Sequence, residues 1–359
     1  MRPTKAFINL DALRHNLEVA AGHAPASKNV AVIKANAYGH GLVEAGFALQ
    51  SRADALAVAT IDEALELRSN GVAGPLLVLQ GVTGRDDVQE AVAGNLWLML
   101  HDRGQVEKVL SMPGDDSITA WLKIDSGMHR LGIPLAEAED ACAALLASPK
   151  ISQPPVLATH FACADELDSP VTPRQIERFL SFARTQGLPL SMANSAGILH
   201  WPASRADWNR PGIMLYGCDP RNTFTAGVAG LRPVMSLRSE IMAIRRVETG
   251  GGVGYGQRWK ATAPSRIATV SAGYGDGYPR HAPDGTPVLV KGKRAALAGT
   301  VSMDMITVDI TGREDVKVGD PVELWGENLL VNEVAAHAGT IGYELLAGMT
   351  RRVPRIFSG

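Results

Sequence analysis

Short apolar runs alternate with amphipathic stretches between residues 12 and 230 of this 359-residue chain. This alternation is typical of βα units, in which successive strands run parallel and lie side by side in one sheet. Eight runs have strand length, at residues 30–33, 55–59, 76–79, 96–100, 118–124, 156–159, 189–193 and 212–216. Eight βα units predict an α/β fold in which the sheet closes into a (β/α)8 TIM-like barrel.

An open, doubly wound sheet is the alternative arrangement of the same units. The dinucleotide-binding form of that fold requires a GxGxxG motif after its first strand, and no such motif follows the first run here. A polar residue placed where an apolar run ends suits a barrel, because barrel enzymes carry their reactive groups at the carboxyl ends of the strands. Thr60 and Glu63 have the spacing of a capping box and predict that a helix begins just before residues 64–68.

The pattern changes after about residue 231 to strand-rich segments separated by glycine turns. Strands are predicted at 234–247, 266–271, 287–291, 305–310 and 321–325, and one short helix at 331–337. We therefore predict a barrel domain at 1–230 and a mainly β domain at 231–359. For the strand at the extreme N-terminus, membership of the β domain is the alternative assignment.

Charge and cysteine content exclude several classes of protein. The net charge is -2 and the pI is near 6.5, so no basic field favours nucleic acid or an anionic membrane as a partner. The three cysteines form no CxxC pair, which predicts neither a disulfide framework nor a metal site. The N-terminus lacks the pattern of a signal peptide, and no run reaches the ~20 apolar residues of a membrane span. We expect a cytoplasmic protein.

Several chemically versatile side chains stand at or near the ends of the predicted barrel strands. They are Lys34, Lys123, Arg130, His160, Ser195 and Arg210. Each has an ordinary alternative reading, such as a solvated lysine, a packing histidine or a turn serine. Because the carboxyl ends of barrel strands share one rim, their coincidence there predicts a common site.

The predicted rim suits a phosphate-bearing ligand. Barrels often bind phosphate with the loops after strands seven and eight, where Ser195, Gly212 and Ile213 lie, and Tyr38 offers a hydroxyl after the first strand. These residues alone are compatible with many phosphate ligands. Lys34 adds an amine that can form a Schiff base, which points to pyridoxal 5'-phosphate (PLP).

Residues 31–41, with the sequence AVIKANAYGHG, resemble the cofactor-lysine signature of the alanine racemase family. Further segments resemble that family in order along nearly the whole chain, at 123–132, 159–162, 194–196, 210–213, 254–256, 273–277, 303–304 and 352–355. The resemblance implies a PLP-dependent racemase with a barrel followed by a β domain. It also implies a homodimer with composite active sites.

The resemblance implies a two-base mechanism for the interconversion of L-alanine and D-alanine. Lys34 would bind PLP and exchange the Cα proton on the D-alanine face, and Tyr255 would serve the L-alanine face from the partner subunit. A phenol titrates near ~10, so Tyr255 needs a cationic neighbourhood to act as a base near neutrality.

The resemblance assigns the remaining cofactor contacts. Arg210 would face the pyridine nitrogen, and His160 would pack against the ring. The other cofactor-binding residues that it implies are Tyr38, Ser195, Gly212 and Ile213.

Substrate contacts are assigned in the same way. Arg130 would bind the carboxylate with the backbone N–H of Met303, and Tyr274 would narrow the access of the substrate. Lys123 matches a lysine that many relatives carry as a carbamate, and an ordinary ion-paired lysine is the alternative. Arg351 stands where some relatives have a tyrosine, and we assign it no catalytic role.

Three alternatives remain beside an alanine racemase. They are an amino-acid racemase of broader specificity, a barrel-type PLP amino-acid decarboxylase and a noncatalytic PLP-binding protein. The paired Lys34 and Tyr255 segments favour a racemase over a decarboxylase. The second domain and its tyrosine loop argue against the noncatalytic protein. A reversible site suits both the supply of D-alanine for peptidoglycan and the degradation of alanine.

Overall fold

The computed structural model describes residues 2–221 and 230–359, which form two compact units. The barrel unit comprises Arg14–Ala37 and Gly41–Leu215. The β unit comprises the described residues of Met1–Leu13, Tyr38–His40 and Tyr216–Gly359.

Eight parallel strands close into a ring in the barrel unit. In order around the ring they are β2 (Lys28–Val32), β3 (Ala55–Val58), β4 (Leu76–Val78), β5 (Leu96–Leu100), β6 (Thr119–Asp125), β8 (Val156–Ala158), β9 (Leu190–Ser191) and β10 (Trp208–Asn209). The ring closes because β10 pairs in parallel with β2. The short strand β7 (Ile133–Pro134) pairs with β6 outside the ring. The predicted barrel is confirmed.

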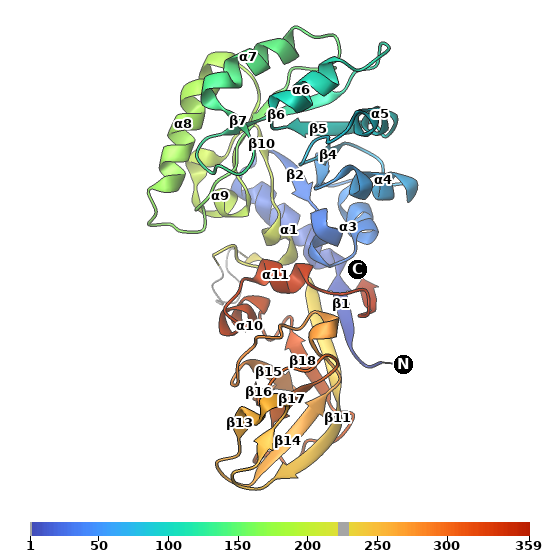
Figure 1. The fold of residues 1–359 in the computed structure, drawn as a ribbon, viewed down its shortest axis with the longest axis vertical. Coiled ribbons are helices and arrows are strands. Elements are labelled where there is room, and N and C mark those ends of the chain that lie inside the picture. Colours follow the sequence, from blue (N-terminus) through green and yellow to red (C-terminus); the bar gives the residue numbers. More distant parts are fainter. Residues whose placement is uncertain (1, 222–229) are drawn as a thin grey trace. The chain divides into compact units, whose positions relative to one another are not determined.

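Helices follow most of these strands along the chain and lie outside the ring (Figure 1). They are α1 (Leu10–His23), α2 (Lys34–Tyr38), α3 (Leu42–Leu49), α4 (Ile61–Ser69), α5 (Arg85–Ala93), α6 (Arg103–Leu110), α7 (Leu135–Leu146), α8 (Val171–Gln186) and α9 (Ser195–His200), with a 3-10 turn η1 (Pro202–Ser204). Strands β3 and β4 are buried along their whole length. A strand covered on both faces shows an unbroken apolar run, which is why these strands are visible in the sequence.

The eighth predicted strand was wrong. Residues 212–216 contain the 3-10 helix η2 (Ile213–Tyr216), and the strand that closes the ring is Trp208–Asn209. Met214 and Leu215 are fully buried, and periodicity alone does not separate a buried helical turn from a buried strand. Arg210 therefore follows the eighth strand instead of preceding it.

One eight-stranded sheet forms the core of the β unit. Its strands, in sheet order, are β14 (Ser265–Val270), β17 (Ile306–Asp309), β16 (Lys293–Leu297), β15 (Pro287–Val290), β18 (Pro321–Trp325), β11 (Met235–Val247), β1 (Lys5–Asn9) and β19 (Arg355–Ser358). The long strand β11 pairs with β1 and β18 in its first part and with β14 in its second. Its register shifts between Ile241 and Ala243, as at a β-bulge, so one strand serves both sets of partners. The predicted mainly β architecture is confirmed.

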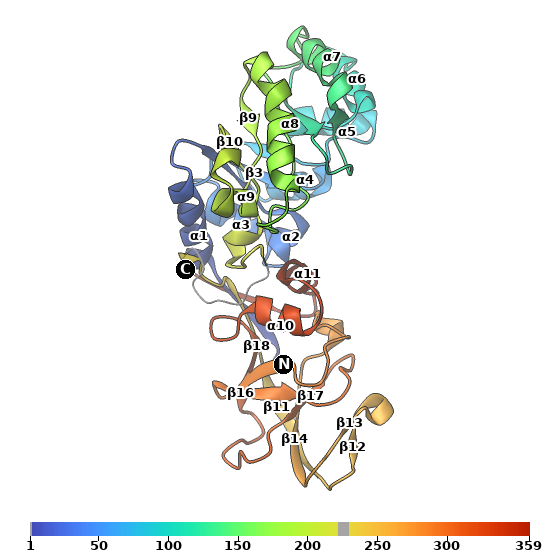
Figure 2. The ribbon, with the colours of Figure 1, turned by 90° about the vertical axis from the view of Figure 1, so that its left-hand side faces the viewer.

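A small hairpin of β12 (Gly252–Val253) and β13 (Trp259–Lys260) stands apart from this sheet, with the 3-10 turn η4 (Tyr255–Gln257) at its tip (Figure 2). Two helices, α10 (Val331–His337) and α11 (Gly342–Ala347), and the 3-10 turn η5 (Tyr274–Asp276) complete the unit. The helix predicted at 331–337 is confirmed. Among the residues that the structure describes, no helix is long and apolar enough to cross a membrane.

Candidate active site

Lys34 is the first residue of α2 and lies two residues after the end of β2. The four residues after it, Ala35 to Tyr38, all have φ between 50° and 54°. Left-handed backbone costs a residue other than glycine roughly 1–2 kcal/mol, and such outliers cluster at functional sites. The segment after Lys34 is thus a left-handed turn that its surroundings must stabilise.

Glu63, in the first turn of α4, supplies part of that support. Its Oε1 accepts hydrogen bonds from the backbone N–H groups of Ala35 (2.6 Å) and Asn36 (3.3 Å). Its Oε2 accepts one from Ala59 (2.8 Å). Thr60 caps α4 by accepting a hydrogen bond from the Glu63 N–H (3.4 Å), so the predicted helix start is confirmed. The Glu63 side chain, however, bonds beyond the cap to the Lys34 turn.

Arg210 is a buried cation that follows β10. Its guanidinium donates to the carbonyl (3.0 Å) and hydroxyl (2.5 Å) of Ser191 and to the carbonyl of Thr159 (2.5 Å). Its Nη2 also lies 3.4 Å from Nδ1 of His160. These contacts fix the guanidinium against the ends of β8 and β9.

Cations dominate the electrostatics of this rim. Burial, followed by the charge of Arg130, lowers the pKa of Lys34 from its ordinary value, and the charge of Glu63 opposes that change. Burial and the charges of Arg210, Arg130 and Lys34 lower the pKa of Lys123 to about 8.

The pKa values of the two other rim groups, His160 and Arg210, are also lowered. Burial, followed by the charge of Arg210, lowers the pKa of His160 well below its ordinary value. Burial lowers the pKa of Arg210 to about 10, which leaves it charged at neutral pH. The rim thus joins charged arginines with a neutral imidazole and with lysines that lose their protons more easily than usual.

Ser195 begins α9 and is buried. Its Oγ accepts hydrogen bonds from the backbone N–H groups of Gly212 (2.9 Å) and Met214 (3.3 Å), so the loops after β9 and β10 meet at this hydroxyl. Asn194 caps α9 by accepting from the Gly197 N–H (2.9 Å). The structure brings Ser195, Gly212 and the adjoining Ile213 together.

Arg130 lies on a loop that Asp125 organises. Asp125 Oδ1 accepts from the backbone N–H groups of Gly127 (2.9 Å), Met128 (3.0 Å) and His129 (3.1 Å). Three backbone donors on one carboxylate oxygen hold the loop in one shape. The exposed Arg130 is close enough to Lys34 and Lys123 to lower the pKa of both.

Tyr38 belongs to the β unit. Its ring centroid lies 4.7 Å from that of Tyr216 and 6.2 Å from that of Tyr343. Burial raises its pKa above the ordinary phenol value. The hydroxyl is therefore a hydrogen-bond donor and not a base near neutrality.

The remaining predicted residues lie on loops of the β unit. Tyr255 is 70% exposed, and its carbonyl accepts a hydrogen bond from Thr300 Oγ1 (3.1 Å). Tyr274 is 38% exposed and Met303 is 52% exposed. Backbone bonds from Tyr274 N to Ser302 O (3.0 Å) and from Gly275 N to Met303 O (2.9 Å) bring their loops together.

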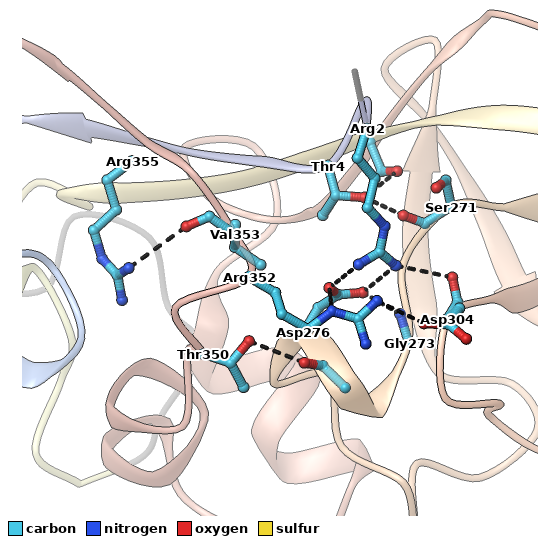
Figure 3. A network of polar contacts seen from close by, with 12 residues as sticks. Arg2, Thr4, Ser271, Gly273, Asp276, Asp304, Thr350, Arg352, Val353 and Arg355 are labelled. Carbon is cyan, nitrogen blue, oxygen red and sulfur yellow. Dashed lines mark hydrogen bonds and ion pairs between the residues drawn. The ribbon is translucent and has the colours of Figure 1, made fainter.

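A polar network lies under these two loops (Figure 3). Asp276 is fully buried and binds both nitrogens of the Arg2 fork, one of them at 2.7 Å, and the Gly273 N–H at 2.9 Å. Arg352 Nε lies 3.5 Å from the same carboxylate, and its Nη2 donates to Asp304 (2.6 Å). This network anchors the loops of Tyr274 and Met303.

The sequence motifs assign no role at the site to Glu63 or Asp276. Glu63 carries a signal, its capping-box spacing, but this spacing predicts only the start of a helix. Asp276 stands inside the 273–277 segment, but its partner Arg2 is remote in the chain. No local pattern joins them.

The fold and the rim define a class of two-part proteins, in which a parallel eight-stranded barrel with a cation-rich rim is combined with a mainly β unit. Residues 8–220 match the family "Alanine racemase, N-terminal domain", and residues 234–357 match "Alanine racemase, C-terminal domain". The chain belongs to the alanine racemase family, whose members are isomerases.

Individual relatives are similar to this chain over its full length. The chain is 48% identical to the alanine racemase of Alteromonas mediterranea, over 99% of this chain and 98% of the relative. It is 46% identical to the catabolic alanine racemase of Pseudomonas putida over the whole of both chains. The crystal structure of the biosynthetic alanine racemase from Pseudomonas aeruginosa superposes with a TM-score of 0.97 at 47% identity and covers both chains completely.

Proposed function

We propose that this protein interconverts L-alanine and D-alanine by using PLP bound at Lys34. The observation that carries the proposal is the cation cluster at the barrel rim, which contains a lysine of lowered pKa in a family of alanine racemases. A larger neutral fraction makes an amine a better nucleophile toward an aldehyde.

The donors at the rim fit PLP. The charges of Arg130 and Arg210 lower the pKa values of Lys34 and Lys123, so an anionic group among these four side chains relieves their repulsion. The Ser195 hydroxyl accepts from the buried N–H groups of Gly212 and Met214 and can donate its own O–H to a phosphate, which supports a phosphate contact in the loops of Ser195, Gly212 and Ile213. Tyr38, as a neutral phenol, adds a donor in this proposal. With PLP bound, Arg210 would donate to the ring nitrogen, and His160 would pack on the ring.

When bound, PLP supplies an electron sink for the pair that remains when Cα loses its proton. Lys34 Nζ removes or returns that proton on the D-alanine face, and the Tyr255 hydroxyl does so on the L-alanine face. Arg130 binds the carboxylate, because its planar guanidinium matches two carboxylate oxygens. The Met303 N–H assists it, and Tyr274 limits access to small side chains.

We propose that the active unit is a homodimer. The exposure of Tyr255, Tyr274 and Met303 is compatible with loops that a second subunit covers, since large side chains are seldom exposed together without a partner. Each site then combines one subunit's rim with the other subunit's Tyr255.

The proposed reaction is reversible, so it suits both the formation of D-alanine and the degradation of alanine. The relatives carry both names, catabolic at 46% and biosynthetic at 47% identity, so similarity favours neither. We also expect the protein to act in the cytoplasm, because Cys142, Cys163 and Cys218 are free thiols, as is typical of a reducing compartment.

The test is to incubate the PLP-loaded protein with L-alanine in deuterated water. We expect D-alanine that carries deuterium at Cα, and we expect none from Lys34→Ala. Racemisation of serine or longer amino acids at comparable rates indicates the broader-specificity racemase. Release of carbon dioxide without D-alanine overturns the proposal in favour of a decarboxylase.

A further inference from the structure

The backbone after Lys34 is held in a conformation that its own residues do not favour. Ala35, Asn36, Ala37 and Tyr38 are all left-handed, and none of them is glycine. The left-handed region is unfavourable for any residue that carries a Cβ, and four such residues in a row add their conformational costs. The turn therefore depends on contacts from outside itself.

Most groups of the turn bond to near neighbours in the chain. Ala37 N donates to Ile33 O (2.8 Å), and Asn36 accepts from Gly41 N (3.1 Å) and, through its side chain, from Leu42 N (2.8 Å). The first two N–H groups, those of Ala35 and Asn36, both donate to one oxygen of Glu63. This side chain comes from a different βα unit.

Glu63 is itself fixed on two sides. Its second oxygen accepts from Ala59 N at the end of β3, and its backbone N–H donates to the Thr60 cap of α4. The carboxylate thus joins the end of one barrel strand and the first turn of one helix to the Lys34 turn. Its placement is set by secondary structure and not by a mobile loop.

Glu63 also supplies charge where cations prevail. Lys34 shares the rim with Arg130, Arg210, Lys123 and His160, and Glu63 is the carboxylate that raises the Lys34 pKa against them. The Glu63 side chain therefore has two roles. It is a backbone clamp, because it accepts from the N–H groups of Ala35 and Asn36, and it is a local negative charge beside Lys34.

We propose that Glu63 is the positioning residue for Lys34, holding the left-handed turn so that the amine is presented for capture of PLP. This inference rests on the proposed function, because PLP capture is the step that it serves. Glu63 does not touch the cofactor in this scheme and acts through the backbone of Ala35 and Asn36.

Two substitutions separate its roles. Glu63→Gln removes the charge and keeps one acceptor oxygen, so part of the clamp survives. Glu63→Ala removes both the charge and the clamp. Glu66→Gln, an exposed carboxylate on the same helix, is the matched control.

The experiment uses full-length protein from which PLP has been removed and measures the dissociation constant of PLP and the pH dependence of its capture. We expect Glu63→Ala to weaken PLP binding by about 10- to 100-fold, since two charge-assisted hydrogen bonds to the turn are lost. Glu63→Gln should have a smaller effect. Without the Glu63 charge the Lys34 pKa falls further, so the acid limb of the capture rate should shift to lower pH in Glu63→Gln.

The outcomes distinguish this inference from the proposed function. If the wild-type protein captures PLP no better than Lys34→Ala, the proposed function fails and the inference fails with it. If the wild type captures PLP and both Glu63 variants behave like Glu66→Gln in affinity and pH profile, only the positioning role is wrong. Should Glu63→Ala not fold, the PLP affinity and pH profile of Glu63→Gln decide together, and values equal to those of Glu66→Gln overturn the positioning role.

Discussion

Nη2 of Arg210 lies 3.4 Å from Nδ1 of His160. A guanidinium has only donors, so the imidazole nitrogen that faces it is an acceptor and carries no proton. Burial and the arginine charge both disfavour imidazolium, and the pKa of His160 lies well below its ordinary value. His160 is therefore a neutral ring at neutral pH, as suits a group that packs against a cofactor.

This neutral ring makes stability depend on pH. The unfolded chain takes up a proton on His160 near pH 6.5, whereas the folded chain does so only at lower pH. The contribution of the neutral His160 to the free energy of unfolding is thus fully present above pH 6.5. It is lost as pH falls toward the folded pKa, by at most about 1.4 kcal/mol per pH unit. His160→Gln should flatten that part of the curve.

Denaturant unfolding of His160→Gln and wild type at pH 7.5 and 5.5 measures the difference. His281→Gln, at an exposed position, is the control and should retain the wild-type slope. Parallel curves for wild type and His160→Gln would mean that the imidazole is protonated in the folded state.

The two-base assignment predicts an asymmetric defect in Tyr255→Phe. Loss of one proton-transfer group should lower the racemisation rate by about 10²–10⁴-fold. In deuterated water, exchange at Cα of L-alanine should be lost, while Lys34 continues to exchange the proton of D-alanine. Equal losses on both faces would be incompatible with separate bases.

Tyr278→Phe is the matched control for that substitution. Tyr278 is buried and stacks on Trp325, with ring centroids 6.0 Å apart, and its hydroxyl has no hydrogen-bond partner within residues 2–221 and 230–359. Removal of an unpaired buried hydroxyl is neutral or slightly stabilising. Both exchange rates should match those of the wild type.

Ser195→Ala should lower both stability and PLP affinity. Two buried N–H groups, those of Gly212 and Met214, lose their acceptor, at a cost of about 1–3 kcal/mol for each donor left unpaired. Thermal unfolding and PLP titration measure the two effects. Ser195→Thr keeps the hydroxyl and should recover most of the affinity, and the prediction is wrong if threonine and alanine are equally impaired.

The parts of this architecture that the sequence predicted are those with strong local patterns. Strands such as β3, buried on both faces, give unbroken apolar runs, and the residues that follow them share a rim by topology. The eighth strand was missed because Trp208–Asn209 is too short to form a run. Strand β16, with the exposed Lys293 and Arg294, has no apolar pattern to detect.

The site was predicted less completely for a different reason. Lys34 was predicted because residue type and strand position coincide, whereas Arg210 was predicted from its residue type and the family resemblance, beside a strand that was misplaced. Glu63 acts on a segment 28 residues away through backbone bonds, and Asp276 pairs with Arg2 across 274 residues. Such pairings form only when the chain has folded, and neither a local motif nor a hydrophobic period in the sequence indicates them.

The buried Asp276 makes the loops of Tyr274 and Met303 depend on the N-terminus. Asp276→Asn keeps the shape of the side chain but removes the charge that Arg2 and Arg352 share, so we expect a loss of about 1–3 kcal/mol in the free energy of unfolding. KM for alanine should rise more than kcat falls, because the proposed function assigns substrate binding to these loops. Arg313→Gln, a substitution elsewhere in the β unit, is the control for a general loss of stability. An unchanged KM in Asp276→Asn would separate the network from the site.

Lys123 is placed to react with carbon dioxide, because its pKa of about 8 leaves a sizeable neutral fraction at neutral pH. A carbamate there would replace one of several mutually repelling cations by an anion beside Arg130 and Arg210, so bicarbonate should raise activity and depletion of carbon dioxide should lower it. Native mass spectrometry with isotopically labelled bicarbonate checks the adduct, which Lys123→Ala must lack. Because only the neutral amine reacts, occupancy should increase from pH 7 to pH 9. An unmodified Lys123 with full activity in bicarbonate-free buffer would support the alternative of an ordinary lysine in the strand.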